Sequence, residues 1–269
     1  MFGKNLAING IFFLTAAIAA AQVHGPQPSV VRPEPQQSPE LSTIAQRMEQ
    51  AARENREHYR AYTVTRNYRL YGGNEQKPSS EVLADISFVP PTTKEFTITE
   101  RKGSSRGETV VRRVLESERK DAASGLAPGA VSSDNYDFTF LGQQPLDGND
   151  CYLLGLKPKR KEKNLVLGRT WVDKNTYLVR RVQGELVKMP SWFVKSAQVT
   201  LEFGDVGGMW LQTRAKATAD VRIFGPHTLT GKALEVRTGA SVAELTAPKP
   251  KTGRRSFRRP QVVLGTIEH

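Results

Sequence analysis

The spacing of apolar residues predicts two helices in the first half of the chain. Apolar residues recur every three or four positions from Leu41 to Tyr59, and the intervening positions are strongly charged. This spacing indicates an amphipathic helix with Ser42 as its N-cap. The same spacing returns between Glu108 and Ala123, and Gly125 is well placed to end this second helix.

A period of two predicts that strands form most of the remainder. It begins at Tyr62 and is broken only by Arg66 in the first expected strand. Segments rich in Asp, Asn and Gly, such as 146–150 and 204–208, supply turn signals. Since strand and helix do not alternate and the connections are short, we expect a single mainly β (α+β) domain in which neighbouring strands pair antiparallel. The expected strands are 62–70, 82–88, 94–101, 136–141, 151–157, 165–172, 177–186, 197–203, 209–217, 221–224 and 229–235.

The first 41 residues differ in composition from the predicted domain. In residues 1–21, Lys4 precedes an apolar run that ends in three alanines, which predicts a cleavable secretory signal peptide. An uncleaved anchor is the alternative, because residues 6–23 are just long enough to span a thin bilayer. Gln22 rather than a cysteine follows the expected cleavage site, which excludes lipid attachment there. Residues 22–41 are rich in Pro and Gln, so we expect a disordered linker.

The positive charge is concentrated near the C-terminus. The formal net charge is +12, and loss of residues 1–21 removes one Lys and no acid. Residues 247–260 hold six basic residues and no acidic ones, so residues 241–269 are expected to form a flexible basic tail. A solvated tail is one interpretation, and contact with an anionic membrane surface is the other. The candidate contacts are Arg254, Arg255, Arg258 and Arg259.

The sequence offers no recognisable catalytic apparatus. The chain lacks HExxH, GxSxG, P-loop and dinucleotide-binding motifs, and its four histidines lie in dissimilar settings. Cys151, the single cysteine, falls within an expected strand and is interpreted as a core residue. We therefore expect no catalytic residues, metal site or cofactor. The basic cluster at 157–163 lacks interleaved aromatic residues, so nucleic acid is not an expected partner.

Aromatic residues are the main functional signal, and they allow two interpretations. The helices cover the apolar side of the sheet as an ordinary core, or they leave a cavity open to an acyl chain. The segment 187–193 suits an exposed loop at the mouth of such a cavity, and the alternative is that it packs down as a lid without functional consequence. Candidate cavity residues are Phe96, Ile98, Phe138, Phe140, Trp171, Trp192, Phe193, Leu201, Phe203 and Trp210.

Residues 42–240 resemble the outer-membrane lipoprotein-sorting proteins, the LolA/LolB-like superfamily. The likeness lies mostly in strand ends and turns, at 140–142, 151–158, 168–173, 190–192 and 208–211. It implies a LolA-like half-barrel in the bacterial periplasm, which is an unclosed antiparallel β-barrel with two short helices covering its concave face. In the best-known relatives the cavity holds lipoprotein acyl chains, whereas sensor relatives share the fold without carrying cargo.

These observations together give a functional hypothesis and one alternative. We expect a periplasmic protein, soluble or peripheral to the membrane, that binds or carries a lipid or lipoprotein acyl chain. The alternative is a non-enzymatic sensor or interaction module with a filled barrel, whose partner is an envelope protein.

Overall fold

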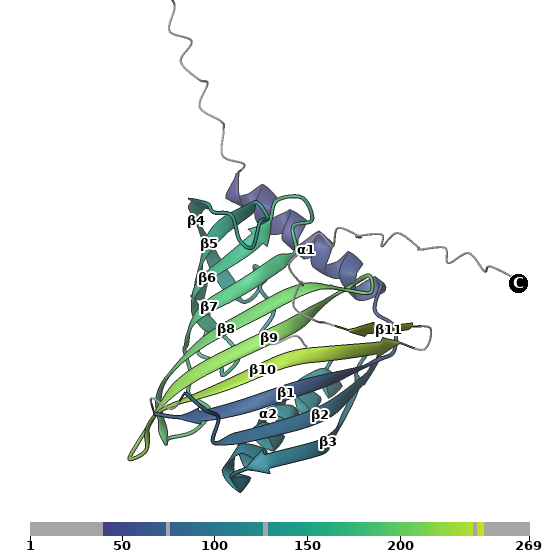
Figure 1. The fold of residues 1–269 in the computed structure, drawn as a ribbon. Helices are drawn as coiled ribbons and strands as arrows, with labels where there is room; N and C mark the ends of the chain where they lie inside the picture. Colours follow the sequence, from purple (N-terminus) through teal and green to yellow (C-terminus); the bar gives the residue numbers. More distant parts are fainter. Residues whose placement is uncertain (1–39, 74–75, 126–128, 239–240, 245–269) are drawn as a thin grey trace, which may run out of the picture. The chain divides into compact units, whose positions relative to one another are not determined.

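One antiparallel sheet and two helices make up the part of the chain that the structure describes. The structure is a computed structural model, and it describes residues 40–73, 76–125, 129–238 and 241–244. The elements are α1 (Leu41–Glu57), β1 (Tyr62–Gly72), β2 (Ser80–Val89), β3 (Thr93–Gly103), α2 (Ser105–Ala123), β4 (Tyr136–Gln143), β5 (Cys151–Pro158), β6 (Val166–Asp173), β7 (Val179–Leu186), β8 (Val194–Val206), β9 (Met209–Val221), β10 (Gly225–Thr238) and β11 (Ser241–Glu244) (Figure 1).

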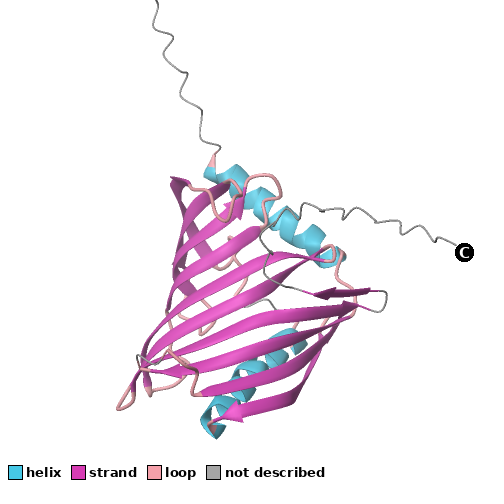
Figure 2. Ribbon diagram, in the orientation of Figure 1, coloured by secondary structure: helices cyan, strands magenta, loops and turns pink. Residues whose placement is uncertain are grey.

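The strands form a sheet that does not close on itself. Their order is β3-β2-β1-β10-β9-β8-β7-β6-β5-β4, and β11 pairs with β10. All pairs are antiparallel, and β1 with β10 is the pair on this path that joins strands distant in sequence. The sheet curves around the two helices (Figure 2). The expectation of an unclosed antiparallel barrel with two covering helices is confirmed.

Both helices cover the same face of the sheet. Ile44 and Met48 of α1 pack against β5 and β6, and Val111 and Leu115 of α2 pack in the cluster formed with β1 and β2. The strand register places Leu154, under α1, and Val82, under α2, at opposite ends of one row of paired residues. That row consists of Leu154, Thr170, Val182, Leu201, Ala215, Gly231, Tyr68 and Val82. Since paired residues point to the same side of a sheet, we call this side the inner face.

The helix boundaries differ from the prediction at both N-termini. Helix α1 begins at Leu41, and its N-cap is Glu40, which makes no side-chain capping bond, so the assignment of Ser42 as N-cap was wrong. Helix α2 begins three residues before the predicted Glu108, because the Ser104 hydroxyl accepts a hydrogen bond from the Arg106 N–H at 3.1 Å. Within residues 40–73, 76–125, 129–238 and 241–244, neither helix has the length and apolar content that a membrane span requires.

The C-terminal strands are longer than the sequence suggested. Residues 221–224 were predicted to form a separate strand, but β9 continues to Val221, and a turn at 222–224 leads into β10. The prediction was wrong because the apolar Ile223 and Phe224 mimic a strand, whereas Ile223 has a positive φ of 73° and is exposed at a hairpin turn. A short strand, β11, also falls in the segment 241–269 that was expected to be a flexible tail.

Candidate functional site

The inner face of the middle strands lies between the regions that the two helices cover. Helix α1 contacts β4 and β9, and α2 contacts β1, β2 and β3. Two rows of paired residues cross the middle strands on this face, and we call them the inner wall. The first row contributes Thr170, Val182, Leu201, Ala215 and Gly231, and the second contributes Gly168, Gly184, Val199, Ala217 and Leu229.

The inner wall is apolar, shallow and only partly covered. Five of its ten residues are Gly or Ala, so the sheet itself supplies little side-chain volume above these positions. Leu201, Ala217 and Leu229 are half-buried rather than buried, although they line the helix-bearing side of the sheet. Val182 and Val199 are buried in the cluster around Tyr136. The half-buried positions are therefore those at which an apolar ligand could contact the wall.

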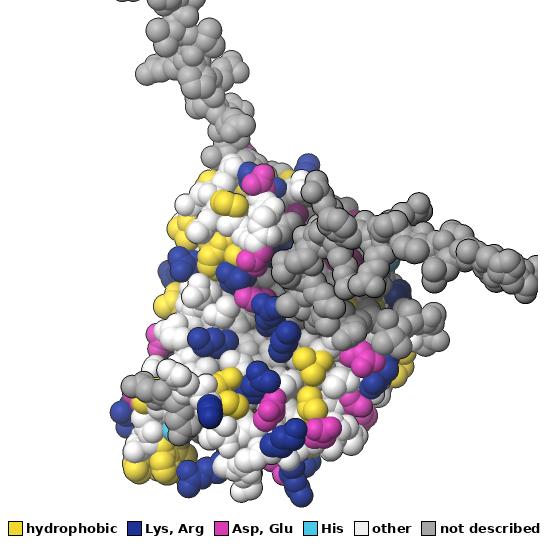
Figure 3. Space-filling model, viewed as in Figure 1, with side chains coloured by type: hydrophobic (Ala, Val, Ile, Leu, Met, Phe, Trp, Pro, Cys, Tyr) yellow, Lys and Arg dark blue, Asp and Glu magenta, His cyan; other side chains and the backbone are white. Residues whose placement is uncertain are grey.

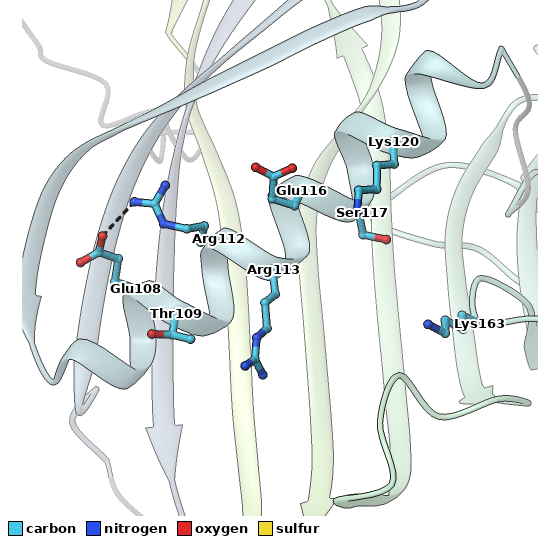
Figure 4. Close-up of a pocket in the computed structure, with 8 residues that line it drawn as sticks. All are labelled: Glu108, Thr109, Arg112, Arg113, Glu116, Ser117, Lys120 and Lys163. Atoms are coloured by element: carbon cyan, nitrogen blue, oxygen red, sulfur yellow. Dashed lines mark hydrogen bonds and ion pairs between the residues drawn. The ribbon is translucent and has the colours of Figure 1, made fainter.

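A cleft of about 530 Å³ runs along the exposed side of α2 (Figure 4). Helix α2 turns Val111 and Leu115 toward the sheet, and the cleft follows its opposite, polar stripe. Figure 4 shows Lys163, on the segment between β5 and β6, across from Lys120 of the helix. The lining residues are Glu108, Thr109, Arg112, Arg113, Glu116, Ser117, Lys120 and Lys163.

The cleft carries surplus positive charge. Glu108 pairs with Arg112 at 2.9 Å, and Glu116 pairs with Arg119 at 3.0 Å. Arg113, Lys120 and Lys163 have no acidic partner within the part of the chain that the structure describes. Lys163 belongs to the basic cluster at 157–163 that the sequence showed. Arg113 and Lys120 were not singled out, because their alignment beside Lys163 depends on how α2 docks. The cleft is therefore suited to an anionic group.

A cluster of buried charge fixes α2 on the sheet. The Glu118 carboxylate of α2 lies 3.1 Å from the Arg66 guanidinium and 2.6 Å from Lys94 Nζ. Burial opposes ionisation of Glu118, but the positive charges of Arg66 and Lys94 outweigh it and lower the pKa of the carboxyl. The sequence signal for this cluster was Arg66, which interrupts the apolar alternation of β1.

The predicted cavity residues fall into several groups rather than one. Leu201 and Phe203 lie on or beside the inner wall, packed against the cluster around Tyr136. Phe138 belongs to that cluster and also to the one beneath α1, where Phe140 lies too. Phe96 and Ile98 pack against the α2 cluster.

The three tryptophans do not lie together. Trp171 was predicted to line the cavity, but it lies on the outer face with Leu146 and Cys151, because its neighbours Thr170 and Val172 point inward. Trp210 donates a hydrogen bond from its indole to the Val179 carbonyl at 2.7 Å, and its backbone bonds to Asn55 of α1. Trp192 is exposed in the loop between β7 and β8, beside Phe193.

The outer face carries a second hollow, of about 430 Å³. Figure 3 shows Lys and Arg side chains spread over this face. Arg214 pairs with Glu202 at 3.6 Å, so part of the positive charge is compensated. The lining residues are Asn67, Arg69, Thr200, Glu202, Arg214, Ala215, Lys216, Thr230, Gly231, Lys232 and Leu234.

Three further predictions concern metal ligands, the single cysteine and the basic tail. The described residues contain no group of three or more His, Cys, Asp or Glu side chains that could hold a metal ion. Cys151 is buried, as interpreted from the sequence, and burial raises the pKa of its thiol. The candidate membrane contacts Arg254, Arg255, Arg258 and Arg259 lie outside the described residues.

Comparisons with known proteins return a family without a described function and several solved structures. A family model described as "Uncharacterized protein" matches residues 126–222, and no curated protein matches the chain. The chain is similar to a DUF1329 family protein from Desulfovibrio piger (16% identity, 75% of this chain and 92% of that one, TM-score 0.37). It is also similar to a putative outer membrane lipoprotein-sorting protein domain from Vibrio parahaemolyticus (13% identity, 73% of this chain and 92% of that one, TM-score 0.38). A third similar structure is a LolA superfamily protein from Nitrosomonas europaea (13% identity, 72% of this chain and 92% of that one, TM-score 0.35).

Proposed function

We propose that this protein binds the acyl chain of a lipid or lipoprotein against its inner wall, as a non-enzymatic binding or carrier protein of the bacterial periplasm. The observation that carries this proposal is the half-buried apolar surface formed by Leu201, Ala217 and Leu229 between the two helices. Transfer of an acyl chain from water to such a surface contributes about 0.8 kcal/mol per buried methylene. A chain that covers the wall would therefore bind firmly without any strong polar contact.

The cleft along α2, a helix on the same face of the sheet as the inner wall, suggests which end of an amphiphile it would hold. The cations of Arg113, Lys120 and Lys163 suit a carboxylate or phosphate, and the wall suits the hydrocarbon. The proposed ligand is thus an anionic amphiphile with at least one acyl chain. Neutral amphiphiles of equal chain length are expected to bind more weakly.

Native mass spectrometry of protein purified without detergent tests for a bound lipid, and displacement of a fluorescent fatty acid measures affinity. Ala217→Trp should fill the wall and weaken binding by at least about tenfold. Lys216→Trp is the matched control, because Lys216 is the adjacent residue of β9 and lines the hollow on the outer face. A wild-type protein that takes up no lipid from a broad panel, or equal affinity in the two variants, would contradict the proposal.

The role of the cleft has its own test. Arg113→Gln combined with Lys120→Gln should weaken binding of a fatty acid by about tenfold and leave binding of the corresponding fatty alcohol within about twofold of wild type. An equal loss for both ligands would show that the cleft does not bind the charged group. If the double variant binds both the fatty acid and the fatty alcohol as tightly as the wild type, the cleft is not part of the binding site.

A further inference from the structure

Two loops meet at one end of the sheet and present large apolar side chains. The loop between β7 and β8 and the turn between β9 and β10 are joined by the Arg222 N–H, which donates to the Phe193 carbonyl at 2.7 Å. The Arg222 side chain donates from Nε to the Trp192 carbonyl at 2.9 Å. We call the apolar residues that these contacts bring together the aromatic tip, which consists of Trp192, Phe193, Ile223 and Phe224.

The aromatic tip is unusually exposed for residues of this kind. The exposed fractions are 72% for Trp192, 42% for Phe193, 91% for Ile223 and 57% for Phe224. The rings of Trp192 and Phe193 stack with their centroids 3.8 Å apart, so they present one combined apolar surface. Figure 3 shows hydrophobic side chains gathered at the lower left of the molecule, with Lys and Arg beside them. Scattered exposed apolar residues are ordinary, but a contiguous group marks an interaction surface.

Positive charge surrounds the aromatic tip. Residues 187–195 and 221–226 contain Lys188, Lys195 and Arg222 and no acidic residue. The Arg106 guanidinium, at the start of α2, lies 5.6 Å from the centre of the Phe224 ring. Asp220 precedes the turn and is paired with Lys195 at 3.4 Å. The surface therefore combines an apolar apex with a cationic surround.

We propose that the aromatic tip docks on an anionic lipid bilayer, with Trp192, Phe193, Ile223 and Phe224 entering the interfacial region. Trp is the side chain best suited to that region, because its ring is apolar and its N–H remains hydrated. Each nearby cation adds attraction to anionic head groups. This charge complementarity favours a bilayer over an apolar protein groove. The inference goes beyond acyl-chain binding, since the tip lies on loops and the inner wall on strands.

The test measures how the purified expected mature chain, residues 22–269, partitions onto vesicles of phosphatidylcholine mixed with phosphatidylglycerol. We expect the wild-type tryptophan emission to shift to the blue and to be quenched by brominated lipid, and Trp192→Phe to abolish both changes while partition persists. Replacing all four tip residues with Ser should lower the partition coefficient by at least about tenfold. Pure phosphatidylcholine should bind the wild type more weakly, because the surrounding cations lose their partners.

Matched controls isolate the contribution of the tip. Val89 and Leu141 are also exposed large apolar residues, at 50% and 53%, and they lie outside the two loops. Val89→Ser combined with Leu141→Ser should leave partition unchanged. All variants share the same N- and C-terminal segments, including the basic stretch at 247–260, so differences between them report on the tip.

Two results would overturn the proposal. One is a wild-type emission spectrum that vesicles do not change, and the other is equal partition of the wild type and the four-Ser variant. Either result would favour a protein partner for the tip. Fatty-acid affinity of the four-Ser variant, measured without vesicles, should match the wild type. Loss of docking is therefore distinguishable from failure of the acyl-binding proposal.

Discussion

Glu118 is the carboxylate on which Arg66 and Lys94 converge beneath α2. Arg66 is buried, so it depends on Glu118 for compensation of its charge. Removing one partner of such a cluster leaves an uncompensated charge, which costs more than the intact pair contributes. We therefore predict that Glu118→Gln lowers the free energy of unfolding by about 3 kcal/mol, measured by urea denaturation.

The control for this prediction lies on the same helix. Glu116 pairs with Arg119 at 3.0 Å, but the Glu116 side chain is 40% exposed and the Arg119 side chain 42%. An exposed pair contributes little, so Glu116→Gln should change the free energy of unfolding by less than about 1 kcal/mol. Equal effects of the two substitutions would show that the Glu118 cluster does not hold α2 in place.

The same carboxylate predicts how stability depends on pH. The pKa of Glu118 is lowered from its ordinary value of 4.5, so the unfolded chain binds the proton more tightly than the folded protein. The stability that Glu118 contributes is complete above pH 4.5 and is lost as the pH falls through the folded-state pKa. We predict that unfolding free energy, measured from pH 7 down to pH 3, falls less steeply in Glu118→Gln than in the wild type. Identical slopes would contradict the lowered pKa.

Residue-level prediction from the sequence succeeded for the burial of Cys151 and failed for the partner of Arg66. Cys151 was correctly interpreted as buried, because it falls within a strand of strongly apolar composition. Arg66 stood out as a break in an apolar alternation, but Glu118 follows it by 52 positions. No local spacing rule relates residues so far apart, since their contact depends on where α2 docks. The same reason kept the cations of the cleft from being recognised together.

At the level of the elements, β6 and β7 approach each other closely at a pair of glycines. Gly168 faces Gly184, and a Cβ on Gly184 would lie 2.3 Å from the Leu167 carbonyl oxygen and 2.7 Å from Gly168 Cα. Neither backbone can move away without breaking the ladder of hydrogen bonds. We therefore predict that Gly184→Ala lowers the free energy of unfolding by about 2 kcal/mol or more.

Gly204 provides a matched substitution on β8. A Cβ at Gly204 would first meet the Thr213 methyl group at 3.7 Å, which is an ordinary contact. Gly204→Ala should therefore be neutral or slightly stabilising, because Ala loses less backbone entropy on folding. Thermal denaturation of the two variants checks the prediction, and similar losses in both would contradict it.

Element boundaries were predicted correctly where a residue with a special backbone preference, such as glycine, marks the end of an element. Gly125 ends α2 as expected, with a positive φ of 67°, directly after the C-cap Ser124. The strand expected at 221–224 was wrong, since three consecutive large side chains indicate a strand whether they lie in a sheet or at an exposed turn. The aromatic tip was missed for the same reason, although an exposed loop was one of the two interpretations of 187–193.

At the level of the whole molecule, the sequence predicted an open antiparallel sheet with two helices, but not which side chains share a face. Alternation within a strand is visible in the sequence, whereas the alignment of faces between strands depends on register. Register is what separates Trp171 from Leu201 and places Ala217 opposite Val199. The inner wall, half of which consists of Gly and Ala, therefore emerges only from the folded structure.

A single sheet also predicts a single unfolding transition, although its apolar residues form separate clusters. Helix α2 contacts β1, β2 and β3, whereas Trp171 lies in a separate cluster on β6. The two regions are connected by the continuous ladder of β1, β10, β9, β8 and β7.

If that ladder unfolds as a unit, Glu118→Gln lowers the urea midpoint seen by tryptophan fluorescence and by far-ultraviolet circular dichroism equally, by about 1 M. A tryptophan-detected midpoint that stays at the wild-type value, while the circular dichroism transition shifts, would show that β1–β3 unfold independently. Cooperative unfolding would also mean that a ligand on the inner wall stabilises the whole sheet. A ligand that binds only the folded state raises the free energy of global unfolding, and every strand that opens only by global unfolding is stabilised by the same amount.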